Sequence, residues 1–193
     1  KALSDFPEQA SAIRYLEKSA GFPIYSGTQT TYLSPGEVKF EYMLEELKKA
    51  ENYIFMEYFI IQEGIMWNSI LDILKEKSKQ GVDVRLLYDD IGCFLTLPKD
   101  FPEQMRSLGI KCYVFNPFRP FWVSEQNNRD HRKIAVIDGK VAFTGGINLA
   151  DEYINAYEKY GHWKDASVMV RGDAAWSFTV FFLQMWALCS KEA

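Results

Sequence analysis

The stretch that decides the fold runs from residue 129 to residue 148 and reads RDHRKIAVIDGKVAFTGGIN. It contains His131, one of only two histidines in the chain, and Lys133 two positions later. Four apolar residues follow, and Asp138-Gly139 separates them from a second apolar run. An Asp-Gly pair between apolar runs is typical of a tight hairpin turn. The stretch therefore predicts two antiparallel strands joined at this pair.

The start of the first strand combines a base with a cation. Side chains two positions apart in a strand point to the same side, so His131 and Lys133 should project together while Arg132 faces away. A neutral imidazole is available as a nucleophile or base near pH 7, and a nearby ammonium group favours the neutral form and binds anions. This pair suits attack on a phosphorus centre with negative oxygens.

Further residues complete the candidate site. Gly145 and Gly146 permit close approach of the backbone, and Asn148 can donate its amide to a phosphate oxygen. The imidazole also needs a partner that fixes its tautomer, for which Asp165 is the main candidate and Glu57 a weaker one. The plainer alternatives remain open: Asp165 caps a turn, and Glu57 lies at an exposed strand end. No metal-ligand spacing appears, so we expect neither a metal nor a cofactor.

Other conspicuous residues have simpler interpretations. We expect His162 to be structural or solvent-facing, and Asp89-Asp90 to form a strand-end loop because no other ligand cluster accompanies this pair. The stretch 116–126 is rich in aromatic residues beside a cation, so it either packs over the core or forms a rim that meets a lipid surface. The residues behind this second interpretation are Phe118, Arg119, Phe121 and Trp122.

The rest of the chain alternates between helix and strand patterns. Helices are expected at 7–20, 34–50, 66–80, 99–109 and 173–188, and strands at 52–61, 82–90, 110–115 and 166–172. A small hairpin is expected within 23–33, and Ser34 should cap the helix that follows. The rhythm of strand, helix and strand over 52–115 predicts a parallel sheet with crossover helices. The aromatic last helix should be covered by further protein.

The composition limits the partners. With 193 residues and 48% hydrophobic residues, the chain is long enough for a well-covered core. A net charge of −4 and a pI of about 5.3 argue against nucleic acid as a partner. The three cysteines are scattered, which fits a reducing compartment. No apolar run is long enough to span a membrane, and because the chain begins with Lys1 we interpret it as a piece of a longer protein.

The residues His131, Lys133 and Asp138 match the HxKxxxxD signature of the phospholipase D superfamily. The surrounding NNRDHRKIAVIDGKVAFTGGINLADEY and HWKDASVMVRG are most similar to the first catalytic half of bacterial cardiolipin synthases, over about residues 31–193. Residues 1–30 would be a separate helix and hairpin segment. The resemblance implies an α/β fold, with a mixed sheet between helices that forms one half of the usual two-lobed enzyme. A second HxKxxxxD is not found, and Gly146 stands where many superfamily members have Ser or Thr.

The resemblance also implies a reaction. His131 would attack a phosphodiester and form a phosphohistidine, Lys133 and Asn148 would bind the phosphate, Asp165 would orient the imidazole, and Asp138 would hold the turn. The substrate would be phosphatidylglycerol, taken from the cytoplasmic face of the membrane, with a membrane anchor upstream. The second half-site would come from a missing C-terminal half or from a second copy of the chain. The alternatives are a homodimeric phosphodiesterase or nuclease, and an isolated half-domain without turnover.

Overall fold

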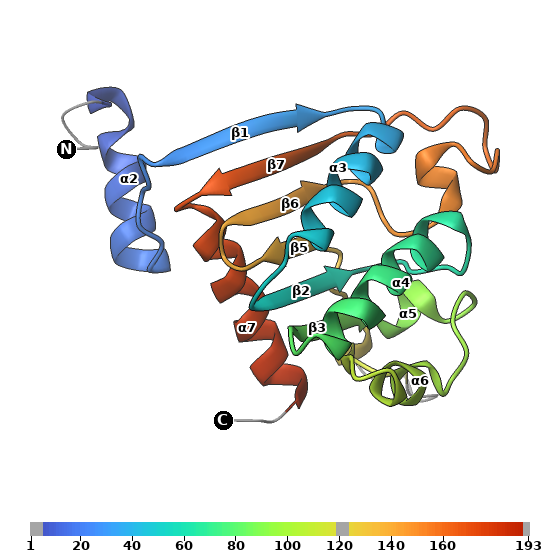
Figure 1. The fold of residues 1–193 in the computed structure, drawn as a ribbon. Coiled ribbons are helices and arrows are strands. Elements are labelled where there is room, and N and C mark those ends of the chain that lie inside the picture. The colour runs from blue at the N-terminus through green and yellow to red at the C-terminus, as the bar shows by residue number, and fades with distance from the viewer. Residues whose placement is uncertain (1–5, 119–123, 191–193) are drawn as a thin grey trace.

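In residues 6–118 and 124–190, which the computed structural model describes, a mixed sheet of seven strands runs in the order β1-β7-β6-β5-β2-β3-β4 (Figure 1). β2, β3 and β4 are parallel to one another, and the other neighbours are antiparallel. The predicted parallel portion and the predicted hairpin at Asp138-Gly139 are thus both confirmed. The strands are β1 (Thr28–Leu33), β2 (Tyr53–Tyr58), β3 (Asp83–Asp89), β4 (Lys111–Phe115), β5 (Ile134–Ile137), β6 (Val141–Gly145) and β7 (Ser167–Gly172).

Helices cover both faces of the sheet, which confirms the expected α/β class (Figure 1). α3 and α4 lie on one face, and α7 lies on the other. The helices are α2 (Ala10–Tyr15), α3 (Gly36–Lys48), α4 (Ile65–Lys79), α5 (Asp90–Cys93), α6 (Phe101–Ser107) and α7 (Ala175–Ser190). A 3-10 turn and a π-helical segment, Pro7–Gln9 and Leu16–Ala20, flank α2, and 3-10 turns also occur at Ser124–Asn127 and Asp151–Ile154. None of the helices described is long and apolar enough to cross a bilayer.

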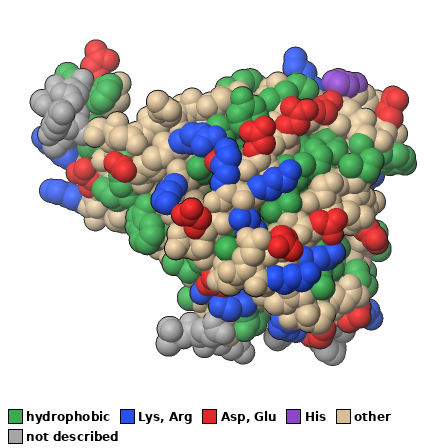
Figure 2. Space-filling model, in the orientation of Figure 1, with side chains coloured by type: hydrophobic (Ala, Val, Ile, Leu, Met, Phe, Trp, Pro, Cys, Tyr) green, Lys and Arg blue, Asp and Glu red, His purple; other side chains and the backbone are tan. Residues whose placement is uncertain are grey.

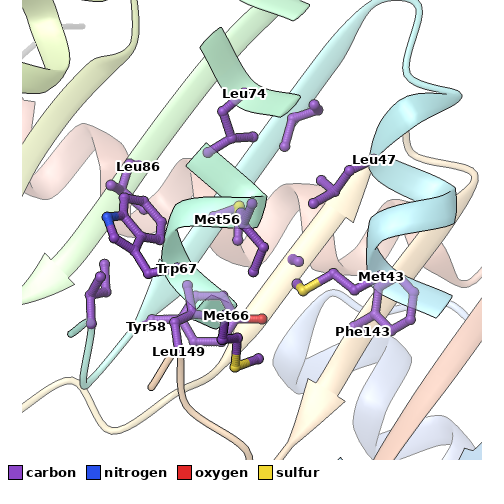
Figure 3. Packing of buried hydrophobic residues seen from close by; sticks show 14 of the residues in the cluster. Met43, Leu47, Met56, Tyr58, Met66, Trp67, Leu74, Leu86, Phe143 and Leu149 are labelled. Carbon is purple, nitrogen blue, oxygen red and sulfur yellow. The ribbon is translucent and has the colours of Figure 1, made fainter. Parts of the chain in front are cut away.

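The larger core lies between the sheet and the pair α3 and α4. Met43 and Leu47 project from α3, and Trp67 projects from α4, toward the sheet residues Met56 and Leu86 (Figure 3). All five side chains are almost fully buried. Burial of an aliphatic side chain of this size contributes roughly 1.5–3 kcal/mol. This packing holds the crossover helices and gives the sheet edge beside them a rigid base.

The smaller core lies under α7. Phe182 is buried and stacks on Phe55 of β2 with 4.8 Å between the ring centroids, and Trp186 is buried beside it. Trp176 and Leu188 on the same helix are 52% and 67% exposed. One side of this aromatic helix therefore meets the sheet, and apolar side chains on another side face outward.

Two local predictions near the start of the chain were wrong. The segment 23–33 does not form a hairpin, because β1 pairs with β7, far along the chain, instead of with a neighbouring strand. Ser34 does not cap α3: its hydroxyl donates to the carbonyl of Asp165 at 2.9 Å, and Pro35 occupies the cap position. β1 also runs across residue 30, where the expected boundary between two segments lay; that division remains a prediction.

Candidate functional site

The sequence-predicted residues, except Asp138, gather at one edge of the sheet. β2 ends at this edge, and β5, antiparallel to it, begins there. β6 ends beside the start of β7 at the same edge, where Gly145 pairs with Ser167. The segments that precede β5, follow β6 and precede β7 are therefore neighbours, although about 35 residues separate the first from the last. This topology brings residues 131–133, 146–148 and 165 to one place.

His131 and Lys133 lie on the same side of the chain, as predicted. The ring centroids of His131 and Phe59 are 4.6 Å apart, and Lys133 Nζ lies 5.5 Å from the centroid of the same Phe59 ring. Lys133 Nζ also donates to the carbonyl of His131 at 2.7 Å. His131 is exposed, whereas Lys133 is buried. Both residues precede β5, which begins at Ile134, so the prediction that they start the strand itself was wrong.

Burial lowers the pKa of the Lys133 ammonium group, and the charges of Asp130 and Asp165 act in the opposite direction. Among the described residues no carboxylate forms a hydrogen bond with Lys133, and an ammonium group in this state, partly stripped of water, is well suited to meet an anionic ligand. The imidazole beside it is open to solvent. The pair can therefore present one nucleophilic nitrogen and one cation to the same phosphate group.

Arg132 points the opposite way and contacts Glu57 on that side. Its Nε lies 2.8 Å from Glu57 Oε1 and 3.0 Å from Asp130 Oδ1. Glu57 is fully buried on β2, on the face that also carries Phe55 and α7. The structure thus places Glu57 next to Arg132 and not next to the imidazole of His131.

Asp165 is held tightly against Gly146. Its Oδ1 accepts from the backbone N–H of Ala166 at 2.7 Å, and its Oδ2 accepts from the Trp163 indole at 3.3 Å. A Cβ added at Gly146 would lie 2.3 Å from Asp165 Oδ1. In the described part of the chain no hydrogen bond joins Asp165 to the His131 ring. Different neighbours exclude a side chain at the two glycines, because a Cβ at Gly145 would meet the Ala166 carbonyl at 2.4 Å instead.

Replacing Gly146 with alanine should therefore displace the Asp165 carboxylate. Turnover of the full-length protein should fall about 10-fold or more, because the carboxylate that is expected to orient the imidazole would move by a sizeable fraction of an ångström. Steady-state kinetics with a phosphodiester substrate will measure this loss. Gly161→Ala controls for backbone strain alone, because its φ is +87° and a Cβ there meets nothing within 4 Å; its turnover should stay close to native. Equal rates for the Gly146 variant and the native protein would contradict the expected role of Asp165.

Asn148 is buried and joins two parts of the site. Its Oδ1 accepts from the backbone N–H of Ile60 at 3.0 Å, and its Nδ2 donates to the hydroxyl of Tyr153 at 2.9 Å. A carboxamide carries two N–H donors. One of them is used by Tyr153, and the second has no partner among the residues that the structure describes. Asn148 therefore ties the end of β2 to its own loop and can still offer one donor.

Asp138 lies at the far end of β5, away from the other candidates. Its carboxylate accepts from the backbone N–H groups of Glu51, Asn52 and Tyr53 at 2.8–2.9 Å. Partial burial opposes the charged form, but these three hydrogen bonds and the charge of Lys140 outweigh it, so the pKa is lowered. Asp138 thus fastens the start of β2 to the turn after β5, an arrangement that agrees with a structural role.

Lys39 is a site residue that sequence reasoning missed. It lies on α3, is 2% exposed, and its Nζ donates to the hydroxyl of Tyr58 at 3.3 Å. Burial lowers the pKa of Lys39 to about 7, and the charge of Asp165 raises it. The signal in the sequence was its spacing: Lys39 stands four and eight positions before Met43 and Leu47, on the apolar side of the helix.

Replacing Lys39 with methionine should change how stability depends on pH. The pKa of this lysine is near 7 when folded and about 10.4 when unfolded. Its contribution to stability is therefore present above the unfolded pKa and lost as pH falls toward 7. The free energy of unfolding of Lys39→Met minus that of the native protein should grow as pH falls from about 10 to 7. Denaturant unfolding at several pH values will show it, with the exposed Lys164→Met as the control. A difference that does not vary with pH would contradict the placement of Lys39.

The remaining predicted features have structural partners. His162 is exposed. Asp89 Oδ1 caps the short helix α5 through the N–H of Gly92 and pairs with Arg129 at 3.2 Å. Within residues 6–118 and 124–190 no group of acidic, histidine or cysteine side chains has the arrangement of a metal site. Phe118 is 49% exposed, but Arg119, Phe121 and Trp122 lie outside the described residues.

Comparison with known proteins identifies the family and the fold. The family described as "Cardiolipin synthase, PLD-like domain" matches residues 43–186. A cardiolipin synthase of Geobacillus kaustophilus is 38% identical over 96% of this chain, and an uncharacterised protein of Streptococcus mutans is 52% identical over 93% of it. The chain spans only 37% and 39% of the lengths of these two relatives. The solved structure of Nuc from Salmonella typhimurium, a phospholipase D family member, has the same fold, with a TM-score of 0.60, 19% identity and coverage of 84% of this chain and 95% of that one.

Proposed function

The chain belongs to the family of cardiolipin synthase, PLD-like domains, and on this premise we propose that it is one catalytic half of a phosphatidyltransferase that makes cardiolipin from phosphatidylglycerol. The observation that carries the proposal is the placement of His131 and Lys133 together on the Phe59 ring at the sheet edge. An exposed imidazole and a partly desolvated ammonium group, fixed side by side, match the needs of phosphodiester chemistry.

In the first step an imidazole nitrogen of His131 attacks the phosphorus of phosphatidylglycerol. The bond from phosphorus to the glycerol oxygen breaks, and glycerol leaves with a proton from an acid of the second half-site. The phosphatidyl group is then bound to His131. Lys133 and the second amide N–H of Asn148 neutralise the non-bridging oxygens, whose charge grows during the attack. No metal is required in this step.

In the second step a hydroxyl of another phosphatidylglycerol attacks the phosphorus. The phosphorus–nitrogen bond breaks, the hydroxyl proton passes to the group that earlier acted as the acid, and cardiolipin is released. The sum is two phosphatidylglycerol molecules converted to one cardiolipin and one glycerol. Asp165 orients the imidazole, which requires the ring to turn from Phe59 toward the carboxylate when substrate binds. Catalytic hydrogen bonds commonly tighten only in the substrate complex.

The second half-site comes from sequence outside this chain or from another copy of it. The relatives are more than twice as long as the chain, which supports the first source. We place the reaction at the cytoplasmic face of the cell membrane, where the substrate resides, and we assign the exposed Phe118 to the side that meets the bilayer. On the face covered by α3 and α4, basic and acidic side chains are interspersed (Figure 2). This face therefore offers no continuous basic surface to a polynucleotide.

The proposal is tested by incubating the full-length protein with vesicles of phosphatidylglycerol and measuring cardiolipin and glycerol together. Equal amounts of the two products support the transferase. Release of phosphatidic acid without cardiolipin would identify a hydrolase instead. Cleavage of DNA or bis-p-nitrophenyl phosphate by a homodimer of this chain would favour the nuclease alternative. If no phosphodiester is turned over at all, the chain is a half-domain without catalysis.

A further inference from the structure

A buried carboxyl group lies directly behind the segment that carries His131. Glu57 has no exposed surface, and among the residues that the structure describes neither of its side-chain oxygens has a hydrogen-bond partner of ordinary geometry. Its nearest cation is Arg132, whose Nε lies 2.8 Å from Oε1. A buried carboxyl group that is so incompletely satisfied costs free energy, so its retention in the middle of a strand needs a reason. The core alone would be served better by an apolar residue.

The reason lies in what Arg132 connects. The same Nε is 3.0 Å from Asp130 Oδ1, so one nitrogen bridges the two carboxyl groups. The backbone N–H of Asp130 donates to Asp89 Oδ2 at 2.9 Å, and Asp89 Oδ1 accepts from Arg129. Residues 129, 130 and 132 are therefore all tied to the ends of β2 and β3. Only His131 and Lys133 in this segment point away, toward Phe59.

We propose that Glu57 is a positioning residue that acts through Arg132 and Asp130 to fix the segment carrying His131 and Lys133. Its importance for catalysis rests on the proposed function, whereas its effect on the position of His131 does not. The contacts described above show that the side chains of this segment, which precedes β5, point alternately to opposite sides. Because Arg132 is held on the α7 side, His131 and Lys133 must point to the other side. The contacts that hold Arg132 and the candidate catalytic pair therefore lie on opposite sides of residues 131–133.

Several charged or titratable groups surround Glu57. On the segment before β5 they are Asp130 and Arg132. On α7, Cys189 lies near them: burial raises its pKa, and the neighbouring carboxyl groups act in the same direction. At the end of β3, Asp89 holds Asp130 and Arg129. Burial, and then the neighbouring Asp130, raise the pKa of Glu57 to about 9, against the opposite effect of Arg132. Glu57 is therefore protonated at neutral pH, and this proton keeps two carboxylates from facing each other across Arg132.

The sign of the pH effect follows from this. The folded pKa lies above the ordinary value of about 4.3, so the stability that the protonated form contributes is complete below that value and is lost as pH rises through about 9. Near pH 9 the second carboxylate becomes charged, and the segment should move away from it. His131 and Lys133 would then lose their position, and activity should fall.

The test follows the His131 ring itself. The chain has only two histidines, so NMR spectra of the imidazoles contain two sets of signals, which a His162→Gln sample assigns. In the native chain the His131 signals should show a step near pH 9. In Glu57→Gln, which keeps the shape but cannot ionise, this step should be absent. The exposed His162 should show no such step in either protein and is the internal control.

Activity gives the second measurement. In the full-length protein, Glu57→Gln should retain turnover within about twofold at pH 7 and lose the fall in activity near pH 9. Arg132→Lys keeps the charge but not the bridging Nε, and its turnover should fall about 10²-fold, as a displaced catalytic group predicts. A step that persists in Glu57→Gln, or an Arg132→Lys protein of native activity, overturns the inference. If His131 responds as expected but no phosphodiester is turned over, the positioning role stands and the proposed function fails.

Discussion

Replacing His131 with alanine in the full-length protein is expected to lower the rate of cardiolipin formation by at least about 10³-fold, because the phosphatidyl group then has no nitrogen on which to be carried. The loss should appear in kcat and not in the affinity for vesicles, since Lys133 and Asn148 remain. Radiolabelled phosphatidylglycerol should label the native protein covalently, and the label should be acid-labile and absent from the variant. Quenched single-turnover reactions will measure it.

The other histidine provides the control. His162 is exposed, so its replacement by alanine should leave the rate within about twofold. Comparable losses in the two variants would mean that neither is specific. A His131→Ala protein that still forms cardiolipin at the native rate would remove the imidazole from the mechanism altogether, and with it the role assigned to Lys133.

Replacing Asp138 with alanine is expected to act on stability instead. Three backbone N–H groups would lose their acceptor, although water can reach this partly exposed position and replace some of these hydrogen bonds. We therefore expect the free energy of unfolding to fall by about 2 kcal/mol. Urea titration of the 193-residue chain, followed by far-UV circular dichroism, will measure it. The turnover of the variant per folded molecule should remain close to native.

Asparagine at the same position separates the contributions. Asp138→Asn keeps an Oδ1 that can accept from Asn52 and Tyr53, and loses the oxygen that accepts from Glu51. Its loss of stability should be less than half that of the alanine variant. A large drop in kcat for either variant at a temperature where both are folded would show that Asp138 acts on the chemistry. In that case the residues at the two ends of β5 would not have separate roles.

Much of the fold followed from local patterns. Asp138 and Gly139 both adopt the left-handed conformation that a tight hairpin needs, and the chain turns there as the Asp-Gly pair predicted. Except for the short helix α5, which stands where a strand-end loop was expected, the helices and strands between residues 34 and 115 were expected from apolar spacing and from glycines at helix ends. These signals involve residues close together in the chain, which is why a single sequence suffices to find them.

The failures involved partners that are distant in the chain. The Thr- and Tyr-rich segment before residue 34 has strand composition, but composition does not say that its partner is β7. The hydroxyl of Ser34 is a good helix cap in isolation, and a carbonyl 131 positions away competes for it successfully. Neither choice leaves a trace in the local sequence.

The site was predicted in part. The alternation of strand side chains correctly separated His131 and Lys133 from Arg132, although the strand itself begins later. The roles of Asp165 and Asn148 stay predictions, and their hydrogen bonds to Trp163 and Tyr153 were not foreseen. Lys39 was overlooked because a lysine in a charged helix is normally assumed to face water, and only the tertiary structure shows that this one does not.

The HxKxxxxD motif spans the whole of β5. Its histidine, the proposed nucleophile, precedes the strand, and its aspartate, which holds the turn, follows it. Selection therefore acts on the histidine through catalysis and on the aspartate through stability, and either can be relaxed without the other. A descendant that abandons catalysis can replace the histidine without loss, whereas replacing the aspartate would still lower its stability. Proteins of this fold that have lost catalysis are therefore expected to keep the aspartate of the motif without the histidine. Proteins that keep the histidine without the aspartate should be scarce.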